Sequence, residues 1–550
     1  MTSGSISSDS EAPAIAPQQD ADAASFAVPV RMSERASRRL WIAACALLLL
    51  AAAILRLYNI ELVPLHHDEG VNGFFLTNLF RDHIYHYDPE NYHGPTLYYF
   101  ALAIVYLLGL TTLAIRSTTA LFGLGTIWLI LMLRRRIGTL GTIAAATCVA
   151  LSPGAIYFSR YFIHETPFVF FMLGMIVYWL KYEDDPWPGF LMVAAVMTGL
   201  LFATKETAII NAVALAAAAI GTRLYFPVRQ RITKRASLPA EETPKKPGKR
   251  RRAQPVSFWG RAMAAVKDPL EKRRLIVWAA ALGVCMFVIV MMYSSMFTYA
   301  RGVKDAVRAF SFWTKTGETG HVHPWYSYVT WLWEEETPLL VLGLLGAGAS
   351  LFLGKRRFAV FISLLELALL IGYSAVPYKT PWLSLSILIP LAITAGCGLE
   401  ALYGYAKSNA EKALCIVLIV VAAGLLLRQA VVLNFYDYDD DRYAYVYAHT
   451  NRDIFGLLNK IDEIARRSGK GKDLTITITT TEYWPLPWYL RNFTRASFYG
   501  QMVNHGDNII IGSTDQEAEL QQTLGASYTS VGTFELRPGV ELVLYAQQGL

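Results

Sequence analysis

Long apolar runs recur along the whole chain and limit what it can fold into. A helix of about 20 apolar residues crosses the hydrocarbon core of a bilayer, and a water-soluble domain has no place for many such segments. Only 17% of the 550 residues are charged, against about a quarter in soluble domains. The sequence therefore predicts a mainly α-helical, polytopic membrane protein. Eleven runs approach the spanning length, at 40–57, 117–133, 139–157, 166–181, 188–203, 207–222, 274–297, 338–354, 357–376, 382–404 and 412–430.

Basic residues beside these runs indicate the orientation of the chain. They cluster at 31–39, 134–136 and 355–357, and the segment 223–274 holds sixteen Lys or Arg against four Asp or Glu. Basic loops stay on the cytoplasmic side, so all four segments are predicted to be cytoplasmic. A nucleic-acid patch is an alternative for 223–274, but its place between two spans favours anionic lipid headgroups. Residues 1–34 lack apolar periodicity and are predicted to be a disordered cytoplasmic tail.

The run at 97–110 complicates the count of spans. Its 14 residues reach about 21 Å as a helix, which is less than the hydrocarbon core of about 30 Å. If it crossed the membrane, the arginines at 134–136 would move to the outer side. We therefore predict an interfacial or re-entrant helix at 97–110 and eleven spans, with twelve or thirteen as alternatives. The outer side then holds the loops 58–95 and 298–337 and the polar stretches 158–165, 204–206 and 377–381.

The composition changes after the last run, near residue 434. A polar segment there continues to the C-terminus, and within it 454–467 has the apolar spacing of a helix. This change predicts a transmembrane domain at 35–433 and an extracytoplasmic α/β domain at 434–550. Strand-like segments of the second domain are 474–479, 508–511 and 540–544.

The most unusual polar stretch follows the first apolar run. Two histidines and two carboxylates stand together at 66–69, and a second polar cluster follows at 91–95. Ionisable side chains near spans are costly unless paired or hydrated, so such a dense group indicates a functional site. For Lys205 and Glu206, a structural salt bridge is as good an explanation as a functional role. For Lys379, the alternative to a functional role is contact with lipid headgroups. Other polar candidates predicted on the same side are Arg160, His164, Glu165, Lys205, Glu206, Tyr378 and Lys379.

Four motifs carry a resemblance to a known superfamily. They are His-His-Asp-Glu-Gly at 66–70, His-Gly-Pro-Thr-Leu-Tyr-Tyr at 93–99, Tyr-Lys-Thr-Pro-Trp at 378–382 and Trp-Pro-Leu-Pro-Trp-Tyr-Leu-Arg at 484–491. With them, the chain resembles the GT-C glycosyltransferases over 35–550. More narrowly it resembles the dolichyl-phosphate-mannose protein mannosyltransferase-like proteins, in the branch labelled flippase activity-associated. The resemblance implies transfer of a sugar from a polyprenyl-phosphate donor to a lipid, glycan or protein acceptor on the outer face of the membrane.

The chemistry of such a transfer assigns roles to individual residues. A lipid phosphate is a good leaving group, so the reaction needs one carboxylate to take the acceptor's proton and cations to stabilise the phosphate. By resemblance, Asp68 is the general base and Glu69 supports or orients it. Inversion at the anomeric centre is an expectation of the class. Arg160 and Lys379 are candidates for the phosphate. Substrate binding is further predicted for His67, His93, His164, Glu165, Lys205, Glu206 and Tyr378.

No cofactor is assigned by the sequence, but a divalent metal stays open. Some members of the superfamily bind a metal near an acidic residue of the second outer loop, and Glu165 is the nearest match here. Together with His67, Asp68 and His164 it could form such a site. The spacing of these residues in the sequence does not decide whether a metal binds.

The rival function is a flippase, a flippase-associated transporter or a scaffold for lipid-linked glycans. A translocation path needs ionisable residues at several depths of the bilayer. In this chain Glu366 is the clearest case inside an apolar run, and the other candidates gather at the outer ends. This distribution favours an outer-face enzyme. We predict a multi-pass protein of the plasma (inner) membrane, with its N-terminus in the cytoplasm.

Overall fold

The computed structural model describes residues 34–236, 269–316, 321–353 and 356–550. The chain divides into two compact units, Met1–Ala44 and Cys45–Leu550, and every contact given below lies within the second. Most of the predicted tail at 1–34 lies outside the described residues, as does the part of the predicted basic loop from 237 to 268.

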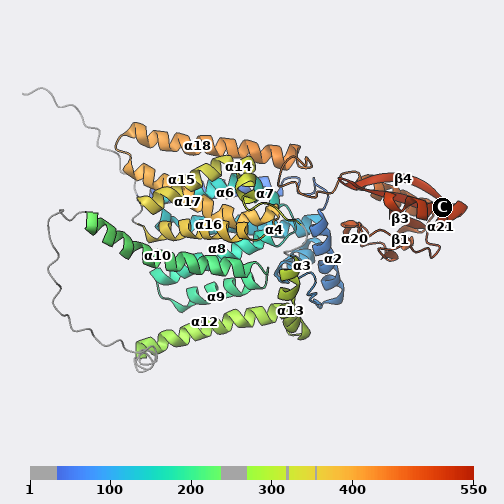
Figure 1. Ribbon diagram of the computed structural model, residues 1–550, viewed down its shortest axis with the longest axis horizontal. Helices are drawn as coiled ribbons and strands as arrows, with labels where there is room; N and C mark the ends of the chain where they lie inside the picture. Colours follow the sequence, from blue (N-terminus) through green and yellow to red (C-terminus); the bar gives the residue numbers. More distant parts are fainter. Residues whose placement is uncertain (1–33, 237–268, 317–320, 354–355) are drawn as a thin grey trace, which may run out of the picture. The chain divides into compact units, whose positions relative to one another are not determined.

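Helices form most of the chain before residue 437 (Figure 1). Every predicted apolar run falls on a helix or, for 139–157, on a bent pair of helices. The helices are α1 (Glu34–Leu57), α2 (His67–Asp82), α3 (Thr96–Leu108), α4 (Thr112–Leu131), α5 (Arg134–Ile137), α6 (Thr139–Leu151), α7 (Pro153–Ser159), α8 (Glu165–Asp184), α9 (Pro188–Phe202), α10 (Ala208–Ala236), α12 (Pro269–Tyr293), α13 (Arg301–Thr316), α14 (Ser327–Glu335), α15 (Thr337–Phe352), α16 (Arg357–Ala375), α17 (Leu385–Tyr405) and α18 (Asn409–Val431).

The number of membrane crossings is bounded by helix length and composition. In the described part of the chain, seven helices are long and apolar enough to cross a bilayer, or up to nine if each of two bent pairs is one span. The apolar helices α3 and α9 are shorter. The chain is therefore a multi-pass membrane protein, and the figure of eleven to thirteen spans stays a prediction.

The two bends in the bundle meet each other. Pro153 follows the end of α6 and has no N–H to continue it, so α7 departs at 57°; Ser152 caps α7 by accepting a hydrogen bond from the N–H of Ala155 (3.0 Å). Glu336 stands at the second break, where α14 and α15 form an angle of 119°. Its Oε1 accepts hydrogen bonds from Ser152 Oγ (2.5 Å) and Gly154 N (2.8 Å), which satisfies polar groups at the break between α6 and α7.

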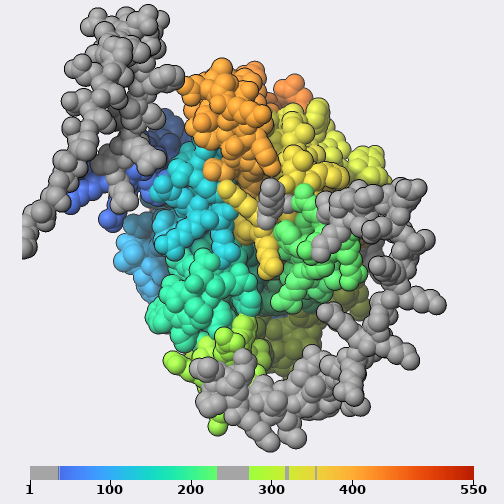
Figure 2. Space-filling model, turned by 90° about the vertical axis from the view of Figure 1, so that its left-hand side faces the viewer, coloured from blue at the N-terminus to red at the C-terminus, as the bar shows by residue number. Residues whose placement is uncertain are grey.

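The helix α17 forms the centre of the bundle and is almost completely buried. Glycines allow its neighbours to approach it closely, as is common between membrane helices. A Cβ atom on Gly396 of α17 would lie 2.3 Å from the carbonyl oxygen of Gly141 in α6, and one on Gly346 of α15 would lie 2.1 Å from that of Thr394. Seen from the helix ends, the yellow and gold helices lie between the orange α18 and the green α10 (Figure 2).

The C-terminal domain is the predicted α/β domain. Its five-stranded sheet has the order β2-β1-β3-β5-β4, with β1 parallel to β2 and β3 and the remaining pairs antiparallel. The predicted helix at 454–467 coincides with α19, whereas β2 and β4 were not predicted. The elements are α19 (Ile454–Arg467), β1 (Ile476–Ile478), α20 (Leu486–Tyr489), β2 (Ala496–Phe498), β3 (Ile509–Ser513), α21 (Glu517–Leu524), β4 (Tyr528–Arg537) and β5 (Val540–Gln547).

Two stretches that were predicted as outer loops contain helices. The helix α2 lies within 58–95, and both α13 and α14 lie within 298–337. These helices are short and mix charged with apolar residues, so they lack the long apolar run by which the spans were recognised. The difference matters because α2 begins inside the polar cluster at 66–69.

Candidate active site

A cavity of about 400 Å³ brings most of the predicted site residues together. Its walls come from the start of α2, the segment before α3, the start of α8, the turn between α9 and α10 and the segment before α17. The predicted residues that line it are His67, Asp68, His93, His164, Glu165, Lys205, Glu206 and Tyr378. Three others, Glu69, Arg160 and Lys379, do not line it.

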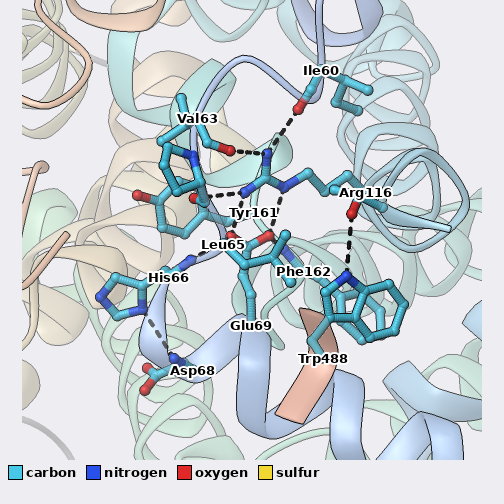
Figure 3. A network of polar contacts seen from close by, with 12 residues as sticks. Ile60, Val63, Leu65, His66, Asp68, Glu69, Arg116, Tyr161, Phe162 and Trp488 are labelled. Atoms are coloured by element: carbon cyan, nitrogen blue, oxygen red, sulfur yellow. Dashed lines mark hydrogen bonds and ion pairs between the residues drawn. The ribbon is translucent and has the colours of Figure 1, made fainter. Parts of the chain in front are cut away.

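The first wall is built by the N-terminus of α2. His66 is the N-cap of this helix, and its Nδ1 accepts a hydrogen bond from the N–H of Asp68 (3.1 Å, Figure 3). Because Nδ1 accepts, the proton of the neutral ring is on Nε2, which donates to the carbonyl oxygen of Tyr447 (2.9 Å). His66 therefore fixes the start of the helix and the direction of the next residues.

Glu69 lies at the centre of a sealed network (Figure 3). Its Oε1 accepts from Arg116 Nε and from the N–H of Phe162 (both 2.8 Å), and its Oε2 accepts from a second Arg116 nitrogen (2.6 Å) and from the N–H of His66 (3.0 Å). The side chains of Glu69 and Arg116 are 0% and 1% exposed. Four donors occupy the carboxylate, so Glu69 has no free oxygen for a proton. The geometry suits the orienting role predicted for it.

Arg116 was missed by the sequence analysis. Besides Glu69 it donates to the carbonyl oxygens of Ile60 (2.9 Å), Val63 (2.8 Å) and Pro64 (3.2 Å), and so connects α4 to the segment before α2. A signal was present, because Arg116 interrupts an otherwise uncharged stretch and a buried cation there requires a carboxylate partner.

The carboxylate of Asp68 differs from that of Glu69 in its burial and in its hydrogen bonding. It is partly buried and lines the cavity. Among the residues that the structure describes, none donates a hydrogen bond to its carboxylate or forms a salt bridge with it. Its place in the first turn of α2 puts a negative charge at the positive end of the helix dipole, which is a favourable arrangement. The carboxylate is thus available to a substrate.

A second wall holds a cluster of four ionisable side chains. Lys205 forms a salt bridge with Glu165, and Glu206 Oε2 lies 2.9 Å from Nδ1 of His93. Burial lowers the pKa of Lys205, but Glu165 and Glu206 outweigh it and hold the pKa above its ordinary value. Burial likewise raises the pKa of Glu206, but His93 and Lys205 hold it below the ordinary value. Lys205 and Glu206 are therefore both charged in the cavity wall, and we call His93, Glu165, Lys205 and Glu206 the cavity cluster.

The motif His-Gly-Pro at 93–95 packs closely against the backbone of the turn between α9 and α10. The N–H of Gly94 donates to the carbonyl of Thr204 (3.0 Å) and the N–H of Thr96 to that of Ala203 (3.2 Å). This contact requires glycine, since a Cβ atom at Gly94 would lie 2.0 Å from the oxygen of Ala203. The paired segments bring His93 to Glu206.

The predicted phosphate ligands Arg160 and Lys379 have other partners. Arg160 donates to the carbonyl oxygens of Tyr58 (2.7 Å) and Asn59 (2.8 Å). Lys379 Nζ donates to the carbonyl of Val376 (2.5 Å). Both cations satisfy backbone oxygens at the ends of helices and loops. Their predicted contact with a phosphate therefore finds no support in the geometry.

The side chains suggested as metal ligands have other partners for the most part. In the described ranges, no group of three or more His, Cys, Asp and Glu side chains could hold a metal ion. Of the four suggested ligands, Glu165 is bound to Lys205, and His164 Nε2 lies 3.1 Å from the carbonyl oxygen of Gly94, to which it donates. Nδ1 of His67 lies 3.5 Å from Arg537, and Asp68 is the suggested ligand without a side-chain partner among the described residues.

The C-terminal domain contacts the helix that carries Asp68. Trp488 is completely buried, and its Nε1 donates to Thr112 Oγ1 at the start of α4 (3.2 Å). Two glycines on one side of α2 make room for it: a Cβ on Gly73 would lie 2.6 Å from the Trp488 ring, and one on Gly70 would lie 2.5 Å from Pro485. The motif at 484–491 therefore packs against α2.

Two further bonds extend this contact. The Tyr489 hydroxyl accepts from the N–H of Leu65 (2.8 Å), directly before His66. Arg491 donates to the carbonyl oxygen of Leu110 (2.9 Å) and its guanidinium lies over the Trp488 ring at 4.0 Å. Tyr489 and Arg491 thus connect the C-terminal domain to the residue before the His66 cap and to the α3–α4 connection.

Comparisons with known proteins agree with this architecture. A family described as dolichyl-phosphate-mannose-protein mannosyltransferase matches residues 92–238. No curated protein matches the chain in sequence. Among solved structures, ArnT from Cupriavidus metallidurans bound to undecaprenyl phosphate is similar, with 14% identity, a TM-score of 0.58 and coverage of 93% of this chain and 98% of that one.

A second similar structure is the oligosaccharyltransferase of Archaeoglobus fulgidus, tethered with an acceptor peptide containing the NVT sequon. It has 12% identity and a TM-score of 0.53, over 91% of this chain and 74% of that one. The ArnT structure without ligand is also similar, with 13% identity and a TM-score of 0.53, over 92% of this chain and 98% of that one. The predicted GT-C fold is confirmed by these matches. The narrower flippase-associated branch stays a prediction.

Proposed function

We propose that this protein is a membrane glycosyltransferase that moves a sugar from a polyprenyl-phosphate donor to an acceptor. The observation that carries the proposal is the carboxylate of Asp68, which lacks a partner among the described residues and lines a cavity within a GT-C fold. The structural neighbour ArnT was crystallised with undecaprenyl phosphate, which supports a polyprenyl phosphate as the carrier. The acceptor is a lipid, a glycan or a protein.

The reaction needs one proton transfer and one displacement. Asp68 takes the proton from the acceptor's hydroxyl or amine as that atom forms its bond to the anomeric carbon. The bond between this carbon and the phosphate oxygen breaks, and its electrons leave with the polyprenyl phosphate. A single displacement of this kind inverts the anomeric centre. Lys205 supplies positive charge in the cavity wall.

The remaining network serves this chemistry by holding Asp68. Glu69 and Arg116 connect the first turn of α2 to α4, and His66 caps the helix. Such support limits the motion of a catalytic group. The cavity lies at the helix ends that we predict to be on the outer face of the plasma membrane, with the N-terminus in the cytoplasm.

The first test compares lipids from cells that lack the protein with lipids from cells that produce a variant. The substitution Asp68→Asn removes the base, and we expect transfer to fall by about 10² to 10⁴-fold, so that the polyprenyl-phosphate sugar accumulates as it does in the deletion. Mass spectrometry of extracted glycolipids measures this. The matched control is Asp82→Asn, at the exposed far end of the same helix, which should restore the wild-type lipid profile.

The same experiment separates the proposal from its rival. A flippase defect would accumulate a complete lipid-linked glycan and would not depend on Asp68. Glu366, the candidate inside an apolar run, accepts a hydrogen bond from Thr394 (2.6 Å) and is 1% exposed, so it is enclosed by the bundle. Restoration of the wild-type profile by Asp68→Asn would show that the assignment of the base is wrong.

A further inference from the structure

A second pocket, of about 520 Å³, lies between α10 and α16, away from the candidate active site. We call it the boundary pocket, and its lining residues are Thr222, Arg223, Phe226, Pro227 and Gln230 of α10 and Arg357 of α16. The residues of α10 recur at intervals of three and four positions, so they share one face of the helix. Among the described residues that line the boundary pocket, none carries a carboxylate. Its wall therefore holds positive charge that no lining residue neutralises.

The boundary pocket lies at the far end of α10 from the active-site cavity. That cavity adjoins the start of α10, because Thr207 and Ile210 line it. Arg223 and Gln230 follow at about 22 and 33 Å along the helix from Ala208, at about 1.5 Å per residue. The helix is long and apolar enough to cross a bilayer, whose hydrocarbon core is about 30 Å thick. The boundary pocket is thus at the opposite membrane surface from Asp68.

Basic residues of other elements gather at the same end of the bundle. Arg356, directly before α16, donates to the carbonyl oxygen of Ile137 at the end of α5 (2.5 Å), and α5 carries the arginines at 134–136. At this end α10 and α16 lie side by side (Figure 2). We predict from these basic residues that the end is cytoplasmic, and the cytoplasmic leaflet is the one that carries a negative surface potential from anionic lipids.

The two arginines of the boundary pocket differ from a third arginine nearby. Among the residues that the structure describes, none forms a hydrogen bond or salt bridge with the guanidinium group of Arg223 or Arg357. Arg357 lies over the ring of Phe226, with its Cζ 5.8 Å from the ring centroid. In contrast, Arg229 donates to the Tyr225 hydroxyl and to a carbonyl oxygen at the end of α15 (both 3.1 Å). Arg229 thus fastens α10 to α15, whereas Arg223 and Arg357 are available to a ligand.

We propose that the boundary pocket binds the phosphate of an anionic phospholipid of the cytoplasmic leaflet. Arg223 and Arg357 donate hydrogen bonds to the phosphate oxygens, for which the planar guanidinium group is well suited. Leu224 and Val228, on the same part of α10, are 60% and 50% exposed and contact the acyl chains. The proposal does not depend on the proposed function, because the boundary pocket lies at the other membrane surface from Asp68.

The composition of the wall favours an anionic lipid over other sources of phosphate. A zwitterionic headgroup carries its own cation, which the two arginines repel, and no described lining residue offers a carboxylate to receive it. Phosphatidylglycerol has a phosphate without such a cation. Phe226 and Pro227 give the wall an apolar part, which matches the glycerol and acyl portions of a lipid and has no counterpart in free phosphate.

The test measures binding of phosphatidylglycerol to the full-length purified protein in detergent by native mass spectrometry. The dissociation constant of the first lipid bound is compared between the wild type, Arg223→Gln and Arg357→Gln. The matched control is Arg135→Gln, which removes one positive charge at the same end of the bundle. Arg135 is exposed and does not line the boundary pocket. Phosphatidylcholine and inorganic phosphate serve as comparison ligands.

We expect each of the two pocket variants to bind phosphatidylglycerol about tenfold more weakly than the wild type, as loss of a charge-assisted hydrogen bond implies. Arg135→Gln should bind it as the wild type does, and phosphatidylcholine should bind more weakly than phosphatidylglycerol. An equal loss in Arg135→Gln, or equal binding of both lipids, would show that only the general surface charge attracts lipid. Displacement of the lipid by millimolar inorganic phosphate would overturn the assignment to a phospholipid.

Thermal unfolding provides a second readout. A ligand that binds the folded state stabilises it, so phosphatidylglycerol should raise the melting temperature of the wild type more than that of Arg223→Gln or Arg357→Gln. Both side chains are exposed, so without added lipid these variants should unfold at the wild-type temperature, which checks that they are folded. An equal rise in all three proteins would contradict the proposal.

This outcome is separate from that of the glycolipid analysis. Asp68→Asn should bind phosphatidylglycerol as the wild type does, because its carboxylate lines the other cavity. If binding depends on Arg223 and Arg357 but sugar transfer does not depend on Asp68, the boundary pocket stands and the proposed function fails. The reverse result leaves the proposed function and overturns the boundary pocket as a lipid site.

Discussion

Two clusters of buried charges near the start of α2 contain the same kinds of residue but differ in what surrounds them. In the sealed network, Glu69 and Arg116 are 0% and 1% exposed, and their polar atoms bond to one another and to backbone groups. In the cavity cluster, His93, Glu165, Lys205 and Glu206 line an open volume of about 400 Å³. The sealed network can hold a structure in place, whereas the cavity cluster can exchange its partners for a ligand.

The difference is sharpest between the adjacent residues Asp68 and Glu69. Successive side chains of a helix point about 100° apart, so one carboxylate faces the cavity and the other faces Arg116 in α4. Two acidic residues that are adjacent in the sequence therefore have different surroundings in the structure. The capping of α2 by His66 fixes which of them faces which way.

The largest predicted effect comes from breaking the sealed network. Arg116→Ala leaves the Glu69 carboxylate buried without its cation, and removal of one partner of a buried pair costs about 3–5 kcal/mol. We expect a loss of this size in the free energy of unfolding, measured by denaturation of the purified protein in detergent. Sugar transfer should also decrease, because the first turn of α2 is no longer held.

The comparison with the cavity cluster provides the control. Lys205→Ala also leaves a carboxylate, Glu165, without its cation, but this carboxylate lines a cavity that water can enter. Its loss of stability should be clearly smaller than that of Arg116→Ala. Equal losses would mean that the two clusters do not differ in the way described.

The roles within these clusters could be predicted from the sequence only in part. The density of polar residues at 66–69 and the resemblance pointed to Asp68, and most of the other site candidates do line the cavity. For Arg160 and Lys379 the sequence does not show that carbonyls of Tyr58, Asn59 and Val376 lie in reach, and their contact with a phosphate stays a prediction. Such partners depend on how distant segments pack.

The part of the fold that could be predicted is the part marked by one strong signal in the sequence, the length of its apolar runs. Long apolar runs marked the helices of the bundle, because every span needs enough apolar length. The helix α2 was missed, since its buried side carries mainly glycine and polar residues and so lacks apolar periodicity. This side faces Trp488, about 400 residues away in the sequence. The strands β2 and β4 were missed for a similar reason: β2 has three residues, and β4 has mixed burial.

A smaller effect tests the contact between α2 and the C-terminal domain. Gly73→Ala places a Cβ 2.6 Å from the buried Trp488 ring, and overpacking of this kind costs about 1–3 kcal/mol. We expect a lower free energy of unfolding and a lower transfer rate, because Trp488 packs on the helix that carries Asp68. The control is Gly283→Ala in α12, where no atom lies within 4 Å; it should be neutral or slightly stabilising. Similar effects of both substitutions would show that Trp488 does not pack on α2 as described.

The smallest predicted effect is a dependence of stability on pH that arises on the cavity side. Burial lowers the pKa of His67 in the folded protein to about 4, below the value of about 6.5 in an unfolded chain. The folded state therefore disfavours the protonated ring. Its contribution to stability is complete above about pH 6.5 and is lost as the pH falls towards 4, because the unfolded chain then binds a proton that the folded chain does not.

The change between pH 7 and pH 5 should be about 1 kcal/mol after allowance for solvent screening. His67→Gln should reduce it, and unfolding measured at both pH values tests this. The sealed network offers the contrast, because the side chains of Glu69 and Arg116 lie 2.6 Å apart and are almost fully buried. If His67→Gln leaves the pH-dependent loss of stability unchanged, the loss does not arise from His67.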